Sequence, residues 1–165
     1  MILPDAEQLL ITLADKIRPL LTPDTALVGI HSGGAWLMQR LLPMLGENLA
    51  SGVLDISFYR DDFSRIGLHP QTKPSQVPFD VQDRHIIIID DVFYTGRTIR
   101  AAINELYDFG RPASVGLAVL VDRGGRELPI EPAYAAARIA LAPAQRLSLE
   151  RAEDGRFSFA VESVD

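Results

Sequence analysis

The sequence predicts an α/β protein in which a twisted, mainly parallel sheet is flanked by helices and followed by a C-terminal β-hairpin. Up to residue 122, short apolar stretches alternate with stretches of helical periodicity, as in proteins whose strands and helices are interleaved. The apolar stretches are nearly continuous, which is typical of parallel strands buried on both faces. Near the C-terminus, two alternating stretches flank Asp154-Gly155, a dipeptide typical of tight hairpin turns.

The first elements are a helix, a strand and a second helix. Residues 5–21 place leucines and isoleucines at helical spacing behind Asp5, a residue type that caps helix N-termini. Residues 25–30 form a short apolar strand, which runs into a glycine-containing turn. Residues 35–45 have helical character. Pro43 must bend or end this helix, because proline lacks the backbone N–H that a helix interior needs.

A strand and a long irregular segment come next. β-branched and aromatic residues predict a strand over residues 52–60. Residues 61–80 show no clean period and contain Pro70, Pro74 and Pro78. A structureless segment of this length within a compact domain is uncommon, and it indicates either a functional lid or a loose excursion.

The second half of the chain continues the alternation of strands and helices. Residues 85–90 and 114–122 read as apolar strands, and residues 97–109 read as the helix between them. Gly110 follows this helix and is its predicted C-cap. The remaining predicted strands, a weak one and the two of the hairpin, cover residues 134–139, 145–151 and 156–162.

Composition and charge narrow the classes of function. The chain has 165 residues, of which 47% are hydrophobic and 23% charged, and no repeat or low-complexity linker divides it, so we expect one globular domain over residues 1–165. The formal net charge is −6, which argues against a protein that binds nucleic-acid phosphates over a broad surface but leaves room for a local arginine patch.

Residue usage also bears on metal sites and location. The chain has no cysteine, which excludes disulfides and thiolate metal sites, and its three histidines lack the spacing of a zinc site. No apolar run approaches the roughly 20 residues that span a bilayer, and the N-terminus lacks the basic region of a signal peptide. We therefore expect a cytoplasmic protein without a membrane partner.

The segment 86–98, IIIIDDVFYTGRT, carries the clearest functional pattern. Asp90 and Asp91 follow four isoleucines at the predicted end of a strand, where ligands of parallel sheets bind. Neighbouring side chains within a strand face opposite sides, so we expect the backbone to turn at this point and bring both carboxylates to one cleft. There they would accept hydrogen bonds from sugar hydroxyls or hold the waters of a magnesium ion.

The turn that follows predicts an anion site. Gly96 can adopt a positive φ, and the amides of residues 95–98 lie at the start of the next helix, where unpaired N–H groups and the helix dipole favour an anion. Two threonine hydroxyls and Arg97 add donors. An anion site close to acceptors for hydroxyl groups suits a ribose that carries a 5-phosphate. Taken alone, each piece also fits a buried strand, a solvated strand end or an ordinary helix cap.

As a whole the segment resembles the phosphoribosyl-pyrophosphate signature of type I phosphoribosyltransferases, in which four apolar residues and two acidic residues are followed by T-G-x-T. The wider chain, from about residue 25 to residue 165, resembles the family of pyrimidine operon attenuators with uracil phosphoribosyltransferase activity. The blocks that carry this resemblance are residues 53–62, 77–81, 86–112 and 117–130. The resemblance implies the type I phosphoribosyltransferase fold.

The resemblance also implies a reaction and its partners. Uracil and phosphoribosyl pyrophosphate would give UMP and pyrophosphate with Mg²⁺. The metal would be held through substrate and waters near Asp90 and Asp91, not by a direct protein site. Pyrimidine operon mRNA is a further partner of such proteins, and homodimers or homotetramers are their expected assemblies.

Site residues follow from the same resemblance. Asp90 and Asp91 would be catalytic and hold the ribose hydroxyls. The residues expected at phosphoribosyl pyrophosphate and its 5-phosphate are Val92, Tyr94, Thr95, Gly96, Arg97 and Thr98. Those of the expected pyrophosphate loop are His31, Ser32, Gly33 and Gly34. Those expected to recognise uracil or nucleotide are Val121, Asp122 and Arg123, and Arg60 and Asp61 would open a mobile lid at about residues 61–80.

One loop and several single residues depart from relatives or have an open role. Tyr94 stands where purine-specific relatives carry an acid, which favours a pyrimidine, although it could also simply pack under the turn. The loop reads G-I-H-S-G-G where attenuators read G-I-R-T-R-G, so it offers less positive charge to pyrophosphate and RNA. Gly125 stands where the family often has histidine. Arg123 and Arg126 would contact nucleotide or RNA phosphates, or belong to a solvated loop.

Two other functions compete with the transferase. The first is a regulator that senses UMP and binds pyrimidine mRNA with weak or no catalysis. The second is a phosphoacceptor signalling domain, because such domains also place acidic pairs at strand ends around magnesium. The T-G-R-T turn and the C-terminal hairpin fit the second alternative poorly.

Overall fold

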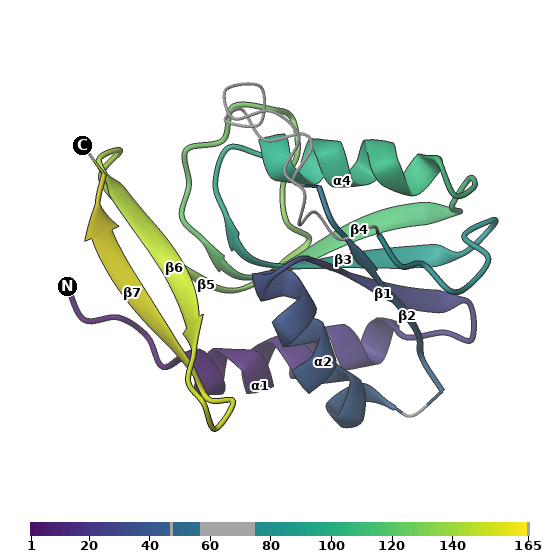
Figure 1. The fold of residues 1–165 in the computed structure, drawn as a ribbon, viewed down its shortest axis with the longest axis horizontal. Helices are drawn as coiled ribbons and strands as arrows, with labels where there is room; N and C mark the ends of the chain where they lie inside the picture. Colours follow the sequence, from purple (N-terminus) through teal and green to yellow (C-terminus); the bar gives the residue numbers. More distant parts are fainter. Residues whose placement is uncertain (47, 57–74, 165) are drawn as a thin grey trace.

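The structure, a computed structural model, describes residues 1–46, 48–56 and 75–164. Five parallel strands form the central sheet in the order β2-β1-β3-β4-β5, and two antiparallel strands form a separate hairpin (Figure 1). The strands are β1 (Thr25–Ile30), β2 (Ala50–Leu54), β3 (His85–Phe93), β4 (Ser114–Asp122), β5 (Tyr134–Arg138), β6 (Gln145–Arg151) and β7 (Phe157–Ser163). The helices are α1 (Ala6–Ile17), a 3₁₀ turn η1 (Arg18–Leu20), α2 (Gly33–Leu45) and α4 (Arg97–Tyr107).

Helices cover both faces of the central sheet, which explains the continuous run of isoleucines in β3. Ile87 and Ile89 pack into the core beneath α1 and α2, and Ile86 and Ile88 pack into the core beneath α4. Figure 1 shows α1 and α2 on one face of the sheet and α4 on the other. A strand that is apolar on both sides is the pattern expected of a covered parallel sheet, so this prediction is confirmed.

The register of the sheet brings several strand ends to one edge. Gly29 of β1 lies opposite Ile89 of β3, and Ile89 lies opposite Ala118 of β4, all in parallel pairing. Pairing of β1 with β3 ends there, whereas β3 and β4 stay paired up to Phe93 opposite Asp122. β3 therefore extends beyond its neighbour β1 at the carboxyl-terminal end of the strands, where ligands of parallel sheets bind.

The N-terminal part of the chain agrees with the predictions at its first cap and differs at two boundaries. The Asp5 carboxylate accepts hydrogen bonds from the N–H groups of Glu7 at 3.0 Å and Gln8 at 3.4 Å, so the predicted cap is confirmed. The α-helix then ends at Ile17 and gives way to η1. The start predicted for α2 at residue 35 was wrong, because Gly33 and Gly34 already form its first turn.

Two later boundaries were also wrong. The strand predicted over 52–60 is β2, which ends at Leu54 within the described residues, while residues 57–60 lie outside them. The predicted C-cap Gly110 does not end α4, because Asp108 occupies the C-cap and its N–H bonds to the carbonyls of the preceding turn. Boundaries depend on local hydrogen bonds that periodicity does not reveal.

The C-terminal hairpin is confirmed, and it stands apart from the central sheet. Its turn contains Gly155, whose φ of 89° requires glycine in practice. Leu147, Leu149 and Phe157 bury their side chains in the core on the α1 and α2 side of the sheet. Side-chain packing, not sheet pairing, therefore determines where the hairpin lies against the body.

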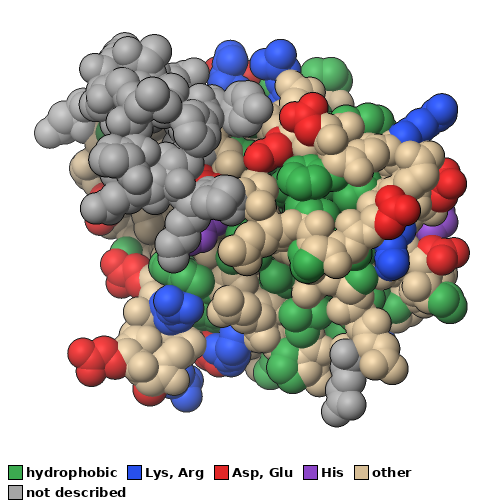
Figure 2. All heavy atoms as spheres, turned by 45° about the vertical axis from the view of Figure 1, so that its right-hand side comes forward, with side chains coloured by type: hydrophobic (Ala, Val, Ile, Leu, Met, Phe, Trp, Pro, Cys, Tyr) green, Lys and Arg blue, Asp and Glu red, His purple; other side chains and the backbone are tan. Residues whose placement is uncertain are grey.

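The surface and helix lengths add two observations. On the face shown in Figure 2, acidic and basic side chains are interspersed, with hydrophobic side chains between them. That face has no extended patch of one charge among the residues coloured by type. In the described part of the chain, no helix combines the length and apolar character needed to cross a membrane.

Candidate functional site

A cavity of about 350 Å³ opens where β3 projects beyond β1. Its size lies in the range of small-molecule sites. The lining residues that the sequence predicted are His31, Ser32, Gly33, Asp90, Asp91, Val92, Tyr94, Thr98 and Arg123. The lining residues that it did not predict are Ile30, Trp36, Arg146, Leu147, Ser148 and Leu149. Four of the latter belong to β6, so the hairpin supplies one wall.

Both aspartates reach this cavity, but for a different reason from the one expected. The backbone was expected to turn at Asp90, and this was wrong, because β3 continues to Phe93. The Asp90 carboxylate accepts the N–H of Asp91 at 2.9 Å, and the Asp91 carboxylate accepts the N–H of Val92 at 2.7 Å. Both acids line one cavity although they belong to the strand. They lie in the part of β3 that extends beyond the end of its pairing with β1.

The start of α2 lies directly against this part of β3. A Cβ atom on Gly33 would collide with the Asp91 carboxylate, and one on Gly34 would collide with the Ile89 carbonyl. Only glycine at both positions allows the helix to approach this closely. The Ser32 side chain makes no capping hydrogen bond, so the amides of the first turn keep donors for an anion. Gly33 lines the cavity, whereas Gly34 packs against the strand.

The start of α4 supplies a second set of amides. Gly96 is the N-cap and has a φ of 97°, as expected for the glycine of this turn. Thr98 lines the cavity, but Thr95, Gly96 and Arg97 do not line it. Arg97 instead points to the following loop, where its Nε donates to Glu127 at 3.1 Å. The Arg97 N–H already donates to Thr95 Oγ1 at 3.2 Å, so an anion at this helix start would meet the remaining backbone N–H groups and the Thr98 hydroxyl first.

Tyr94 and Arg123 form a stacked pair at the cavity wall. The Arg123 guanidinium lies 3.9 Å from the centre of the Tyr94 ring, a cation–π geometry. Arg123 is only 8% exposed, and it donates to the carbonyls of Gln145 at 2.8 Å and Ala142 at 3.2 Å. Its terminal nitrogens therefore bind the start of the hairpin. A Cβ on Gly125 would collide with the Tyr94 ring, so the histidine common in relatives would require the ring to move.

The other predicted base-recognition residues lie deeper. Val121 is buried in the core, and its strand position pairs with Val92 and Ala137. Asp122 is also buried, and its carboxylate accepts the N–H of Gly124 at 3.0 Å. Neither residue lines the cavity that contains the two acids of β3. Asp122 lines a neighbouring open hollow of about 440 Å³, together with Arg123, Gly124, Arg126, Arg138, Ile139 and Ala140.

The predicted lid lies mostly outside the described residues. Arg60, Asp61 and the rest of residues 61–74 belong to the part of the chain that is not described. The end of the predicted segment is described, and there Gln76 exchanges two backbone hydrogen bonds with Val53 of β2, both of 2.8 Å. These bonds attach the end of the segment to the edge of the central sheet.

The hairpin residues were missed because nothing local marks them as part of a site. Arg146 lines the cavity, and its side chain makes no hydrogen bond or ion pair within the described part of the chain. Trp36 lines the cavity too, and the Arg151 guanidinium lies 4.5 Å from the centre of its ring. The alternation of β6 was visible in the sequence, but its place beside β3 follows from packing between distant segments.

The acidic pair is also the candidate metal-binding feature of the cavity. Among the described residues, no group of three or more histidine, cysteine or acidic side chains could hold a metal ion. Asp90 and Asp91 nevertheless bring two carboxylates to one cavity. Mg²⁺ commonly binds one or two protein carboxylates and keeps several waters or substrate oxygens, so this pair fits that ion.

A family model and individual known proteins are both similar to this chain over most of its length. The model of the phosphoribosyl transferase domain matches residues 3–139. Bifunctional protein PyrR of Nitrosococcus oceani is 57% identical over 136 residues, which cover 81% of this chain and 76% of that protein. Bifunctional protein PyrR of Pseudomonas syringae pv. syringae is 46% identical over 157 residues, which cover 93% of this chain and 92% of that protein.

Solved structures show the same architecture. A purine phosphoribosyltransferase from Pyrococcus horikoshii matches with a TM-score of 0.62 and 27% identity, over 84% of this chain and 87% of that chain. A hypoxanthine-guanine phosphoribosyltransferase from Bacillus anthracis matches with a TM-score of 0.66 over 87% of this chain and 84% of that chain. Its identity is 16%, so this second likeness shows the fold alone.

Proposed function

This chain belongs to the phosphoribosyl transferase domain family, and within it to the family of Bifunctional protein PyrR. On this basis we propose that it is a uracil phosphoribosyltransferase. It would transfer the ribosyl 5-phosphate of phosphoribosyl pyrophosphate to uracil, giving UMP and pyrophosphate. The observation that carries this proposal is that two acids, Gly33 of the first turn of α2 and Thr98 of the first turn of α4 line one cavity. The fold is that of the type I phosphoribosyltransferases.

In this reaction the protein mainly holds the two reactants in place and stabilises the charge that develops on them. The bond between C1 of the ribose and the pyrophosphate oxygen breaks, and its electron pair leaves with pyrophosphate. Uracil N1 releases its proton to water and forms the new bond to C1. Positive charge develops on the ribose during this exchange, and carboxylates of Asp90 and Asp91 at its hydroxyls would stabilise it. Holding both reactants in line contributes the rest.

Two helix starts would bind the two phosphate groups. The amides at the start of α4 and the Thr98 hydroxyl would hold the 5-phosphate, and those at the start of α2 would hold pyrophosphate. Support comes from Thr98 and Gly33, which line the same cavity as the acids. Mg²⁺, carried by the substrate and by waters near Asp90 and Asp91, would neutralise the negative charge of the leaving group.

Tyr94 would favour a pyrimidine. Tyr94 is 38% exposed and lines the cavity, and its ring stacks on Arg123 and leaves no room for a side chain on Gly125. A neutral aromatic wall offers no carboxylate partner to a purine ring. We therefore assign the ring as a wall of the base subsite.

A steady-state assay with alternative bases tests the proposal. The protein would be supplied with phosphoribosyl pyrophosphate, Mg²⁺ and either uracil, orotate, hypoxanthine or xanthine. UMP formation from uracil, with little turnover of the other bases, is the expected result. Turnover of a purine base in preference to uracil, or no turnover by a folded sample that binds UMP, would reject it.

We propose a second function, regulation of a pyrimidine operon through its mRNA with UMP as effector. Support comes from the relatives, which are named bifunctional, and from Arg126 and Arg138, which line the neighbouring hollow. UMP-dependent and salt-dependent retardation of the leader RNA would support it. Failure to bind that RNA at low salt, with UMP bound, would count against it.

We also propose that the protein works in the cytoplasm as a homodimer or homotetramer. Light scattering after size-exclusion chromatography would measure the mass of the assembly. A single mass of one chain at micromolar concentration would contradict the expected assembly.

A further inference from the structure

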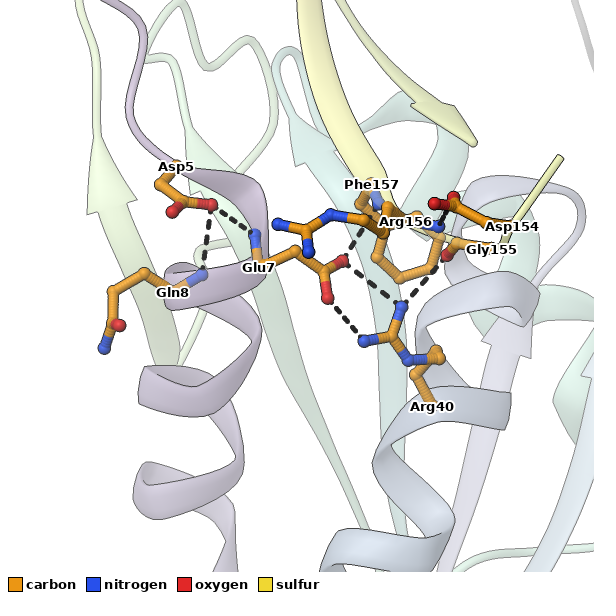
Figure 3. A network of polar contacts seen from close by, with 8 residues as sticks. All are labelled: Asp5, Glu7, Gln8, Arg40, Asp154, Gly155, Arg156 and Phe157. Carbon is orange, nitrogen blue, oxygen red and sulfur yellow. Dashed lines mark hydrogen bonds and ion pairs between the residues drawn. The ribbon is translucent and has the colours of Figure 1, made fainter. Parts of the chain in front are cut away.

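An ion pair between α1 and α2 also holds the turn of the C-terminal hairpin (Figure 3). Arg40 donates from Nη2 to Glu7 Oε1 at 2.6 Å and from Nη1 to Glu7 Oε2 at 3.2 Å. The same Nη1 donates to the Gly155 carbonyl at 3.0 Å, and the Phe157 N–H donates to Glu7 Oε2 at 2.9 Å. Each partner of the pair thus binds hairpin backbone as well as the other partner.

The environment of this pair makes it stronger than a typical surface pair. The Arg40 guanidinium lies 5.0 Å from the centre of the Phe157 ring, which is itself buried in the core. The Glu7 side chain is 20% exposed and that of Arg40 39%, compared with 63% and 49% for Asp15 and Arg18 of the exposed pair near the end of α1. Bidentate, partly buried pairs that join hydrogen-bond networks contribute more than isolated exposed ones.

The hairpin connects this ion pair to the cavity. Phe157, at the start of β7, pairs with Arg151 of β6, whose guanidinium stacks on Trp36 of the cavity wall. Arg146 and Leu149, also on β6, line the cavity directly. The hairpin forms no strand pair with the central sheet among the described residues, so apolar packing in its middle and polar contacts at its two ends place β6. Arg123 holds one end, and the ion pair holds the other.

We infer that Glu7 and Arg40 are positioning residues for the substrate site. They do not line the cavity, but they fix the hairpin turn, and through β6 they place the wall that faces the two acids of β3. Their loss leaves the acids and both helix starts in place and loosens one wall. This inference rests on the proposed function for its kinetic readout and on the contacts alone for its structural readout.

The kinetic test compares Arg40→Gln with a matched control. Arg18→Gln removes the exposed ion pair to Asp15 and a hydrogen bond to the Met44 carbonyl of α2, at the other end of α1 and away from the hairpin. Arg40→Gln is expected to raise the KM for phosphoribosyl pyrophosphate and the Kd for UMP about 10-fold, equivalent to about 1.4 kcal/mol. Its kcat stays within about twofold, because the reacting groups are untouched. Equal KM and Kd values in Arg40→Gln, Arg18→Gln and the parent protein would overturn the inference.

A structural readout separates this inference from the proposed function. Trp36 is the single tryptophan of the chain and contacts Arg151, so its emission reports whether β6 is docked. Arg40→Gln is expected to shift this emission and to speed amide exchange over residues 145–163, with residues 85–93 unchanged. An unchanged emission and exchange pattern would overturn the inference even if the protein forms UMP. A parent protein without activity would reject only the proposed function.

A second variant guards against a general loss of folding. Arg40→Lys keeps the charge but cannot form the bidentate contact and reach Gly155 with the same planar group. It is expected to give a smaller shift in UMP Kd than Arg40→Gln, with the same direction. If Arg40→Gln fails to fold, an Arg40→Lys variant that matches the parent in Kd and in exchange would reject the inference.

Discussion

At the scale of single residues, Asp90 and Asp91 show how neighbouring side chains of a strand can serve one cavity. Strand geometry directs the two side chains to opposite faces. Both nevertheless line the cavity, because this part of β3 extends beyond its paired neighbour β1. Each carboxylate accepts an N–H from the next residue, which leaves the acids fixed to their own strand. Fixed carboxylates stabilise a developing charge without having to reorganise.

Replacing one acid tests this role. Asp91→Asn keeps the side-chain shape and an oxygen acceptor for the Val92 N–H, so the fold is expected to persist. The loss of negative charge is expected to lower kcat about 10²- to 10³-fold, the range seen when one charge-stabilising group is removed. Steady-state kinetics and circular dichroism would measure both effects. Asp24→Asn, at an exposed aspartate before β1, is the control and should match the parent protein.

Arg146 is the second residue whose effect can be measured. It lines the cavity without a partner among the described residues, and Arg123 is already bound to the hairpin backbone. A substrate with several phosphate groups would meet the Arg146 charge. Arg146→Gln is expected to raise the KM for phosphoribosyl pyrophosphate about 10-fold and to weaken its dependence on salt.

A control at the other end of the strands, before β4, makes the Arg146 result specific. Arg111 is exposed in the connection that precedes β4, and Arg111→Gln removes the same charge from the protein. Its KM should equal that of the parent protein. An equal rise of KM in both variants would show a general charge effect and would contradict a role for Arg146 in the cavity.

At the scale of elements, the approach of α2 to β3 depends on the absence of side chains. Gly34 lies against the Ile89 carbonyl, and Gly29 of β1 lies against the backbone of residues 34 and 35. This contact presents the α2 amides beside the acids of β3. The glycines of the loop thus act through packing as much as through turn geometry.

Gly34→Ala tests that contact. The added Cβ would collide with the Ile89 carbonyl, a backbone atom that cannot rotate away, so α2 must shift. We expect a loss of about 2 kcal/mol in the free energy of unfolding, which urea denaturation would measure, and a higher KM for phosphoribosyl pyrophosphate. Gly116→Ala in β4 is the control, because its Cβ would meet no atom within 4 Å. A Gly34→Ala protein as stable as Gly116→Ala would contradict the close contact.

At the scale of the whole molecule, the N-terminal helix, α2 and the C-terminal hairpin share one charged network. The hydrogen bond from Arg40 lowers the pKa of Glu7, despite the opposing effect of burial, and the Phe157 N–H adds to the lowering. A carboxyl group with a lowered pKa in the folded state stabilises the fold above its unfolded pKa. This contribution is lost as the pH falls through the folded pKa.

Glu7→Gln should therefore change the acid side of the stability profile. The variant is expected to be less stable than the parent at neutral pH, and the two profiles should converge below the lowered pKa of Glu7. Thermal unfolding from neutral pH to about pH 3 would measure this difference. Glu150→Gln, at an exposed position of β6, serves as the control. Parallel profiles for Glu7→Gln and the parent would contradict the linkage.

Much of the fold could be predicted from the sequence because its signals are local. The isoleucines of β3 predict a strand buried on two faces, Asp5 predicts a helix start, and Asp154-Gly155 predicts a hairpin. Each signal depends on a few consecutive residues and on the period of one element. Ends such as that of α4 at Tyr107 were less predictable, because they depend on competing backbone hydrogen bonds.

The order of strands and helices, the acidic pair beside a glycine turn, and the family signature that they form can all be read from the amino-acid sequence. Three contacts became visible only in the folded molecule: β6 faces the acids, Arg123 binds the start of the hairpin, and Glu7 and Arg40 hold its turn. These contacts join residues far apart in the chain. They arise from burying apolar side chains of the hairpin against the helices, and no local pattern specifies which surfaces will meet.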